Sequence, residues 1–174
     1  IIKEKNINKN GTLLHSFYMG THTGTHLDVP AHVIPNSKTL NNFSLDSFYG
    51  LAIKIKPNQF NILDEINYKI DGVIYDAGWY KNFNNPKIFF GKNRPIISSD
   101  LIDKCLNQKI KFFGCDLPSV DKSGSSEKPI HNALLGSDII IYESLANLNQ
   151  LPLLIPFDFY GFPLPFLGLD GSPV

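Results

Sequence analysis

The segment THTGTHLDVPAH, residues 21–32, restricts the fold of this chain more than any other part of the sequence. It holds three of the five histidines, and its polar side chains alternate with small or apolar residues. These polar residues are His22, His26, Asp28 and His32. Imidazole nitrogens and carboxylate oxygens bind Zn²⁺ at about 2.0–2.2 Å. Because six residues of straight strand span roughly 20 Å, these side chains converge on one ion only if the backbone bends.

Two residues of this segment permit such a bend. Gly24 lies between the first two histidines and can adopt dihedral angles that other residues avoid. Pro30 lacks an N–H group and therefore ends strand pairing. The alternation directs Leu27, Val29 and Val33 to the other side of the backbone. We therefore predict a polar face curved around a metal ion and an apolar face packed on the core.

The composition indicates a soluble globular protein with one domain, residues 1–174. Lys+Arg and Asp+Glu both number 16, which argues against a nucleic-acid or membrane-surface partner. There is no apolar run long enough to span a bilayer, and the start, IIKEKNINKN, lacks the apolar middle of a secretory signal. Cys105 and Cys115 are too few for a disulfide framework, so we expect buried reduced thiols and a cytoplasmic location.

The pattern of apolar residues predicts an α/β protein with more strand than helix. Five segments rich in Ile, Val, Phe and Tyr are predicted strands: Leu51–Lys56, Gly72–Gly78, Lys109–Asp116, Asp138–Leu145 and Leu151–Phe162. A capping serine followed by apolar residues at helical spacing predicts a helix over 98–109, and a short helix is expected across Ser44–Phe48. The prolines of the tail, residues 159–174, favour an irregular or edge element.

The stretch HTGTHLDVPAH resembles the motif HxGTHxDxPxH of the cyclase-like metal-dependent hydrolases, and all seven fixed positions match. Three later stretches are also similar to that family: GCDLPSVD at 114–121, HNALLGSDIIIYESL at 131–145 and GLDGSPV at 168–174. The resemblance extends from about Ser16 to Val174. It implies a compact α/β domain of the swivelling β/β/α type, in which a mixed or barrel-like sheet packs with helices.

The resemblance also implies a set of metal ligands. His22, His26 and Asp28 would bind one ion, and Asp28 would bridge to a second ion held by His131 and Glu143. The sequence around Glu143 also supports its role as a ligand, because an unpaired carboxylate in the apolar run IIIYESL is costly to bury. The alternative for Glu143 is a strand-end carboxylate that faces water. Zn²⁺ suits this donor set, as one or two ions, and Mn²⁺ is the alternative.

The remaining histidine of the motif, His32, is expected to move protons. The resemblance implies a general base or proton shuttle, and the ordinary imidazole pKa near 6.5 suits that task at neutral pH. The alternative is an outer partner that orients Asp28. His15 has no partner in the sequence and is expected to have a structural or surface role.

Other residues near these stretches have two interpretations each. Gly24 and Thr25 are expected to orient the turn, and a backbone N–H there is a candidate for contact with an oxyanion. Three polar residues either support the ligands from outside or form a local turn: Asp116, Ser119 and Asp121. Three aromatic residues either stack on an aryl group or fill the core: Trp79, Phe17 and Tyr18. The stretch DAGW at 76–79 stands where many relatives have Arg-Thr-Gly-Trp, and this departure from the family leaves the pocket wall undefined by the resemblance.

The resemblance implies a metal-dependent amidohydrolase of the arylformamidase type, active in tryptophan catabolism. Its expected reaction is hydrolysis of N-formylkynurenine to kynurenine and formate, and two metal ions favour this branch. Hydrolysis of a cyclic amide such as isatin, or of a lactone, is the alternative, and a catalytically silent metal-binding relative is the alternative from another class. No Gly-x-Ser-x-Gly stretch occurs, so no covalent serine intermediate is expected. A small-molecule amide and a second copy of the chain, as a homodimer or higher oligomer, are the expected partners.

Overall fold

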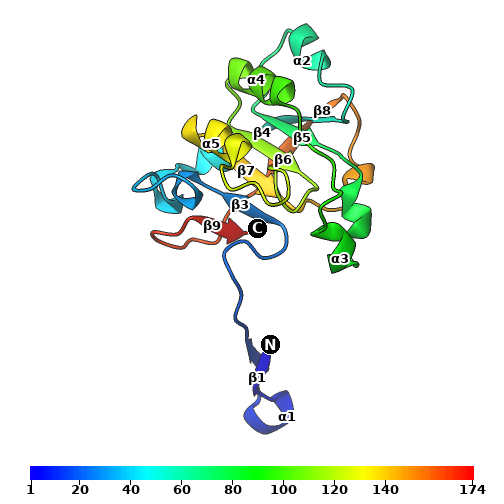
Figure 1. Cartoon of the computed structure of the whole chain (residues 1–174). Coiled ribbons are helices and arrows are strands. Elements are labelled where there is room, and N and C mark those ends of the chain that lie inside the picture. The colour runs from blue at the N-terminus through cyan, green and yellow to red at the C-terminus, as the bar shows by residue number, and fades with distance from the viewer.

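A seven-stranded mixed sheet with the order β8-β4-β5-β6-β7-β3-β9 forms the centre of the computed structural model, which describes residues 1–174 (Figure 1). The strands are β1 (Ile2–Lys5), β2 (Leu14–Ser16), β3 (His26–Asp28), β4 (Tyr49–Ile55), β5 (Gly72–Tyr75), β6 (Phe112–Cys115), β7 (Ile140–Glu143), β8 (Pro156–Tyr160) and β9 (Gly171–Pro173). The α-helices are α1 (Ile7–Asn10), α2 (Ile62–Glu65), α3 (Pro86–Phe89), α4 (Ser99–Gln108) and α5 (Pro129–Gly136). The 3₁₀ helices are Pro30–His32, Leu40–Asn42, Leu45–Phe48, Trp79–Asn82 and Leu148–Gln150.

The four central strands, β4 to β7, run parallel, and the other strands of the sheet are antiparallel to their neighbours. Parallel strands buried on both faces have nearly continuous apolar sequences, as the run IIIYE near β7 illustrates. The carboxyl ends of these parallel strands lie next to one another at one end of the sheet, where ligand sites of α/β proteins commonly form. Glu143, the last residue of β7, lies at that end.

Apolar side chains cover both faces of the sheet. On one face, α2, α4 and α5 pack on a cluster of buried residues that includes Ile53, Val73 and Phe113. On the other face, the 3₁₀ helices Leu40–Asn42, Leu45–Phe48 and Leu148–Gln150 and the chain around β8 pack on a second cluster that includes Ala52 and Phe112. Because adjacent strand residues such as Phe112 and Phe113 point to opposite faces, each parallel strand contributes to both clusters.

The predicted α/β class with a mixed sheet is confirmed, and β8 and β9 are the edges of that sheet. The helix predicted over 98–109 is confirmed as α4, and the one across Ser44–Phe48 is a 3₁₀ helix. The strand predicted over Leu151–Phe162 begins only at Pro156, because Leu154 has a φ of 58° and interrupts extended backbone. Helix α5 is not predicted from the sequence; it has only eight residues and begins at Pro129, shortly after a segment rich in Ser and Gly.

The N-terminal segment up to β2, together with the chain that leads from it toward the sheet, forms an arm that extends away from the sheet (Figure 1). It contains the two-stranded antiparallel pair β1 and β2 with α1 between them. None of these three elements has a buried residue. The expected buried thiols are present, since Cys105 and Cys115 are both buried and unpaired. No helix has the length and apolar character that a bilayer crossing requires.

Candidate metal centre

The histidine-rich segment bends where Gly24 lies, and this residue has a φ of 70°. Strand β3 then begins at His26 and pairs with β7 so that His26 is opposite Glu143. Leu27 and Val29 are fully buried on the core side, as the alternation predicts. The bend and the pairing together bring the motif and Glu143, far apart in sequence, to the same place.

Asp28 lies at the middle of the cluster and is fully buried. Its Oδ1 is 2.7 Å from Nδ1 of His22 and 3.5 Å from Nε2 of His26. Its Oδ2 is 3.5 Å from Nε2 of His131 and has no hydrogen-bond partner. A buried carboxylate oxygen without a donor is costly, and a cation at this position would offset that cost. The orphaned oxygen is therefore the observation that fits a metal ion.

Glu143 completes the cluster on the side of β7. Its Oε1 lies 3.3 Å from Nε2 of His131, and its Oε2 lies 3.5 Å from Nε2 of His26. Oε1 also accepts a hydrogen bond from the backbone N–H of Val120 at 2.7 Å, which fixes the carboxylate. All five residues predicted as ligands are therefore brought together. Donor atoms of His22, His26 and Asp28 lie within 4.8 Å of one another, a spacing that can hold an ion.

Two of the imidazoles are oriented by acceptors on their outer sides. Nδ1 of His26 lies 2.8 Å from the carbonyl oxygen of Gly24, and Nδ1 of His131 lies 2.6 Å from Oδ2 of Asp121. Carbonyl and carboxylate oxygens only accept, so each Nδ1 carries the proton. Nε2 of both rings therefore faces the carboxylates at the centre, and once it gives up its proton it offers the lone pair that a metal ligand needs.

The charges of the cluster shift its pKa values. Burial lowers the pKa of His22, but hydrogen bonds and charge attraction from Asp28 and Asp170 outweigh burial and raise it to about 9. Burial likewise lowers the pKa of His131, but its hydrogen bond to Asp121 and the nearby carboxylates of Asp28 and Glu143 outweigh burial and raise the pKa to about 11. The pKa of Asp28 is well below its ordinary value, because the nearby imidazoles of His131 and His22 outweigh the effect of its burial. In the metal-free protein, the raised pKa values favour protonated rings of His22 and His131, whose positive charge balances the carboxylates that a cation would otherwise neutralise.

His32 lies at the open edge of this cluster, at the end of the 3₁₀ helix Pro30–His32. Its ring centre is 4.2 Å from that of His22 and 5.4 Å from that of His131. The side chain is 22% exposed, and Nδ1 lies 3.4 Å from Oδ2 of Asp170. Burial lowers the pKa of His32, and the positive charge of His22 adds to that effect. A neutral imidazole next to the cluster can accept a proton at pH 7.

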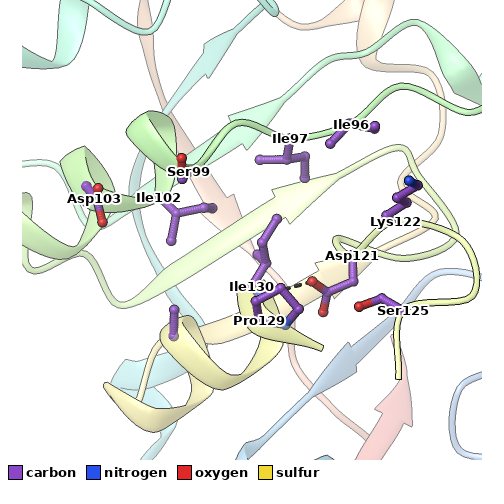
Figure 2. A pocket seen from close by; sticks show the side chains of 11 residues that line it. Ile96, Ile97, Ser99, Ile102, Asp103, Asp121, Lys122, Ser125, Pro129 and Ile130 are labelled. Atoms are coloured by element: carbon purple, nitrogen blue, oxygen red, sulfur yellow. Dashed lines mark hydrogen bonds between the residues drawn. The ribbon is translucent and has the colours of Figure 1, made fainter. Parts of the chain in front are cut away.

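Of the three polar residues expected either to support the ligands or to form a turn, Asp121 is the one that contacts a candidate ligand, His131. Besides the His131 ring, its carboxylate accepts hydrogen bonds from the backbone N–H groups of Ile130 and His131 at the start of α5. Asp121 also lines a cavity of about 290 Å³ whose walls include Ile96, Ile97 and Ile130 (Figure 2). His131 does not line this cavity, which is therefore separate from the cluster of ligands.

The other two polar residues of the stretch GCDLPSVD, Asp116 and Ser119, stabilise local turns. The carboxylate of Asp116 accepts hydrogen bonds from the backbone N–H groups of Ala77, Trp79 and Tyr80, and so holds the turn after β5. Ser119 Oγ accepts from the N–H of Asp121, which is a local turn. Neither side chain contacts a candidate ligand. For these two residues the turn interpretation describes the structure.

Thr25 orients the bend, as expected, because its hydroxyl donates to the carbonyl oxygen of Ser144 at 2.8 Å. The three candidate aromatic residues do not line the cluster. The indole N–H of Trp79 donates to the carbonyl oxygen of Phe89 at 3.0 Å, and the ring packs against the core. Phe17 and Tyr18 lie on the arm and are 66% and 100% exposed.

His15 also lies on the arm, as an exposed residue of β2, which agrees with its expected surface role. One further residue of the cluster was missed from the sequence. Asp170 precedes β9, and its Oδ2 lies 2.8 Å from Nε2 of His22. Asp170 belongs to the stretch GLDGSPV, which resembles the family's ending but carries no other local indication of a site.

Comparison with known proteins identifies relatives of this chain. The cyclase family, described as putative cyclase, matches residues 3–122. A kynurenine formamidase of Salinibacter ruber is 29% identical, over 98% of this chain and 81% of the relative. One of Geobacillus thermodenitrificans is 32% identical, over 90% of this chain and 75% of the relative. These enzymes confirm the predicted class, a metal-dependent amide hydrolase.

Among solved structures, an isatin hydrolase bound to the product analogue thioisatinate superposes with a TM-score of 0.83. The superposition covers 99% of this chain and 78% of that chain at 21% identity, so the likeness is one of fold. The match of the family over most of the chain, and the formamidases at about 30% identity, establish the relationship. The chain belongs to the cyclase family.

Proposed function

We propose that this protein hydrolyses an aryl formamide, with N-formylkynurenine as substrate and kynurenine and formate as products. The observation that carries the proposal is the cluster around Asp28, which brings together three imidazoles and two carboxylates and includes an orphaned buried oxygen of Asp28 itself. A neutral histidine, His32, stands at the open edge of that cluster. The kynurenine formamidases among the relatives support this choice of substrate.

We assign two ions to the cluster. His22, His26 and Asp28 would hold one, and Asp28, His131 and Glu143 would hold the second. Imidazole and carboxylate donors suit Zn²⁺, and Mn²⁺ is the alternative. When bound, such a cation polarises a carbonyl group and lowers the pKa of water, so that water becomes a nucleophile near neutral pH.

The chain's own residues then move one proton. Because Nδ1 of His32 faces Asp170, its Nε2 is free to accept a proton from the attacking water. The water oxygen adds to the formyl carbon, the C–N bond breaks, and His32 returns the proton to the nitrogen of the leaving amine. No side chain forms a covalent bond with the substrate in this scheme.

The test is an assay of the zinc-loaded protein with N-formylkynurenine and isatin in parallel. We expect turnover of N-formylkynurenine, and a loss of at least about 100-fold in kcat for His32→Asn, since general acid–base groups contribute about 10²–10⁴-fold. Metal content should stay unchanged, and His15→Asn is the matched control because His15 is exposed on the arm. Turnover of isatin alone would replace the proposed substrate. Loss of metal in His32→Asn would make His32 a ligand.

We also propose that the protein is a homodimer, or a higher oligomer, in the cytoplasm. The arm supports the oligomer, because it exposes a series of apolar side chains: Ile1, Ile2, Ile7, Leu13, Leu14, Phe17 and Tyr18. Apolar surface of this extent commonly marks a protein–protein contact. Light scattering during gel filtration should give at least twice the monomer mass for the full chain, and the monomer mass once residues 1–18 are removed.

A further inference from the structure

We propose that Asp170 is a positioning residue of the metal centre, which orients His22 with Nδ1 toward Asp28 and holds His32 through the same carboxylate. The inference rests on the proposed function, because it requires that His22 is a metal ligand. In this role Asp170 acts by orienting His22 and His32, and it does not contact the substrate.

The ring of His22 is held between two carboxylates. Nε2 lies 2.8 Å from Oδ2 of Asp170, and Nδ1 lies 2.7 Å from Oδ1 of Asp28. When Nδ1 gives its lone pair to a cation, the remaining ring proton is on Nε2 and is donated to Asp170. His26 and His131 already have such outer acceptors in Gly24 and Asp121. Asp170 therefore supplies the acceptor for the third imidazole, and outer acceptors of this kind fix the ring and strengthen the ligand.

The backbone holds Asp170 in place. Strand β9 pairs with β3 so that Gly171 is opposite Asp28, which places Asp170 immediately beside the cluster. The N–H of Val29 donates to the carbonyl oxygen of Asp170 at 3.1 Å. The hydroxyl of Thr21 donates to Oδ1 at 3.3 Å, which leaves Oδ2 for the imidazoles. The carboxylate position is thus set by strand pairing and by two hydrogen bonds.

The next residue, Gly171, shows how closely the ring is confined. A Cβ atom at this position would lie 2.8 Å from Cε1 of His22 and 2.7 Å from the carbonyl oxygen of Leu27. Real Cβ atoms do not approach other atoms so closely. The ring of His22 therefore lies against bare backbone on one side and against the Asp170 carboxylate at its edge. The dipeptide Asp170–Gly171 forms one cradle for the ring.

The same oxygen also reaches His32, whose Nδ1 lies 3.4 Å from Oδ2 of Asp170. This contact is longer than the one to His22, yet it keeps Nδ1 of His32 on the side of Asp170 and Nε2 free. Donor atoms of His22, His32 and Asp170 also lie within 4.8 Å of one another. Direct ligation by Asp170 is the competing role, but the orphaned buried oxygen that needs a cation belongs to Asp28.

The experiment compares Asp170→Asn with the wild type and with Asp158→Asn, a control at an exposed position on β8. Zinc stoichiometry and affinity are measured by competition with a chromophoric chelator. Histidine tautomers of the zinc-loaded protein are read from ¹⁵N-edited NMR of the ring nitrogens. We expect Asp170→Asn to keep the wild-type stoichiometry and to bind one ion about 10–100-fold more weakly. The Nε2–H signal of His22 should shift or lose its protection from exchange, and Asp158→Asn should match the wild type.

A second variant guards against a failure of Asp170→Asn to fold. Thr21→Val removes the hydrogen bond to Oδ1 and leaves the carboxylate in place, so a smaller loss of zinc affinity is expected. Unchanged affinity together with an unchanged His22 signal in Asp170→Asn would overturn this inference alone. Loss of one whole ion would make Asp170 a ligand and would also overturn it. A wild-type chain that binds no zinc would overturn the proposed function, and this inference with it.

Discussion

Oδ2 of Asp121 lies 2.6 Å from Nδ1 of His131, while Nε2 of the same ring faces Asp28 and Glu143. The carboxylate of Asp121 also accepts from two backbone N–H groups at the start of α5. One side chain therefore fixes both the first turn of the helix and the ring that the helix carries. Removing its charge should weaken metal binding without unfolding the protein.

For Asp121→Asn, we expect zinc affinity to fall about 10–100-fold, the usual effect of losing a partner that orients a ligand histidine. Competition with a chelator measures the change. Asp103→Asn is the matched control, because Asp103 lines the same cavity as Asp121 and is exposed on α4. An affinity equal to that of the wild type would show that the ring of His131 is held by other contacts.

Zinc binding near pH 7.5 should release about two protons per chain, because metal ligands must give up their protons. The pKa values of His22 and His131 in the metal-free protein, about 9 and about 11, leave both rings charged at this pH. Calorimetric titrations in buffers of different ionisation enthalpy give the number directly. His22→Asn should release about one proton fewer. A binding heat independent of the buffer would contradict the charged state of these rings.

The stability of the metal-free protein should fall as the pH rises from 6.5 to 9. His22 has a raised pKa in the folded protein, so its contribution is complete below the unfolded value of 6.5 and is lost as the pH passes about 9. The decrease in the free energy of unfolding that is due to His22 is at most about 3 kcal/mol. Denaturant unfolding across this range, with a chelator present, measures it. His22→Asn should show a shallower decline, and a stability that rises with pH would refute this assignment.

Asp28→Asn should abolish tight zinc binding, since both proposed ions share this carboxylate. In the wild type, zinc at about 1,000 times its Kd should add about 4 kcal/mol to the free energy of unfolding. The variant should lose this gain, and its metal-free form should also be less stable, because His22 and His131 lose a buried partner. Thermal unfolding with and without zinc measures both effects. A zinc-dependent gain of full size in the variant would remove Asp28 from the ligand set.

Lys54 offers a prediction about stability that is independent of the metal. Its buried ammonium group donates to the carbonyl oxygens of Leu148 and Leu151 at 2.8 and 2.6 Å, and lies 3.9 Å from Asp76. Lys54→Met should lower the free energy of unfolding by about 2–4 kcal/mol, because these buried acceptors lose their donor. Lys56→Met, at the next exposed position, should change it by less than about 0.5 kcal/mol. Comparable values for the two variants would show that the bonds of Lys54 contribute little.

Much of the cluster could be predicted because its signals are local. His22, His26 and Asp28 lie within seven residues, and the glycine between the histidines indicates the bend. Alternation of polar and apolar residues indicates which side chains share a face, since successive strand residues point in opposite directions. His131 and Glu143 required the resemblance to the family, because neither residue has a local partner that marks it as a ligand.

The sequence by itself determined the bend, the alternation and the apolar runs of the parallel strands, since all three depend on residues that are neighbours in the chain. Only the tertiary structure decided that Asp170 contacts His22 across 148 positions, and that Asp121 lies behind His131. These contacts depend on the pairing of β9 with β3 and on where α5 begins. Such long-range packing is set by the free energy of the whole folded chain, and no local pattern encodes it.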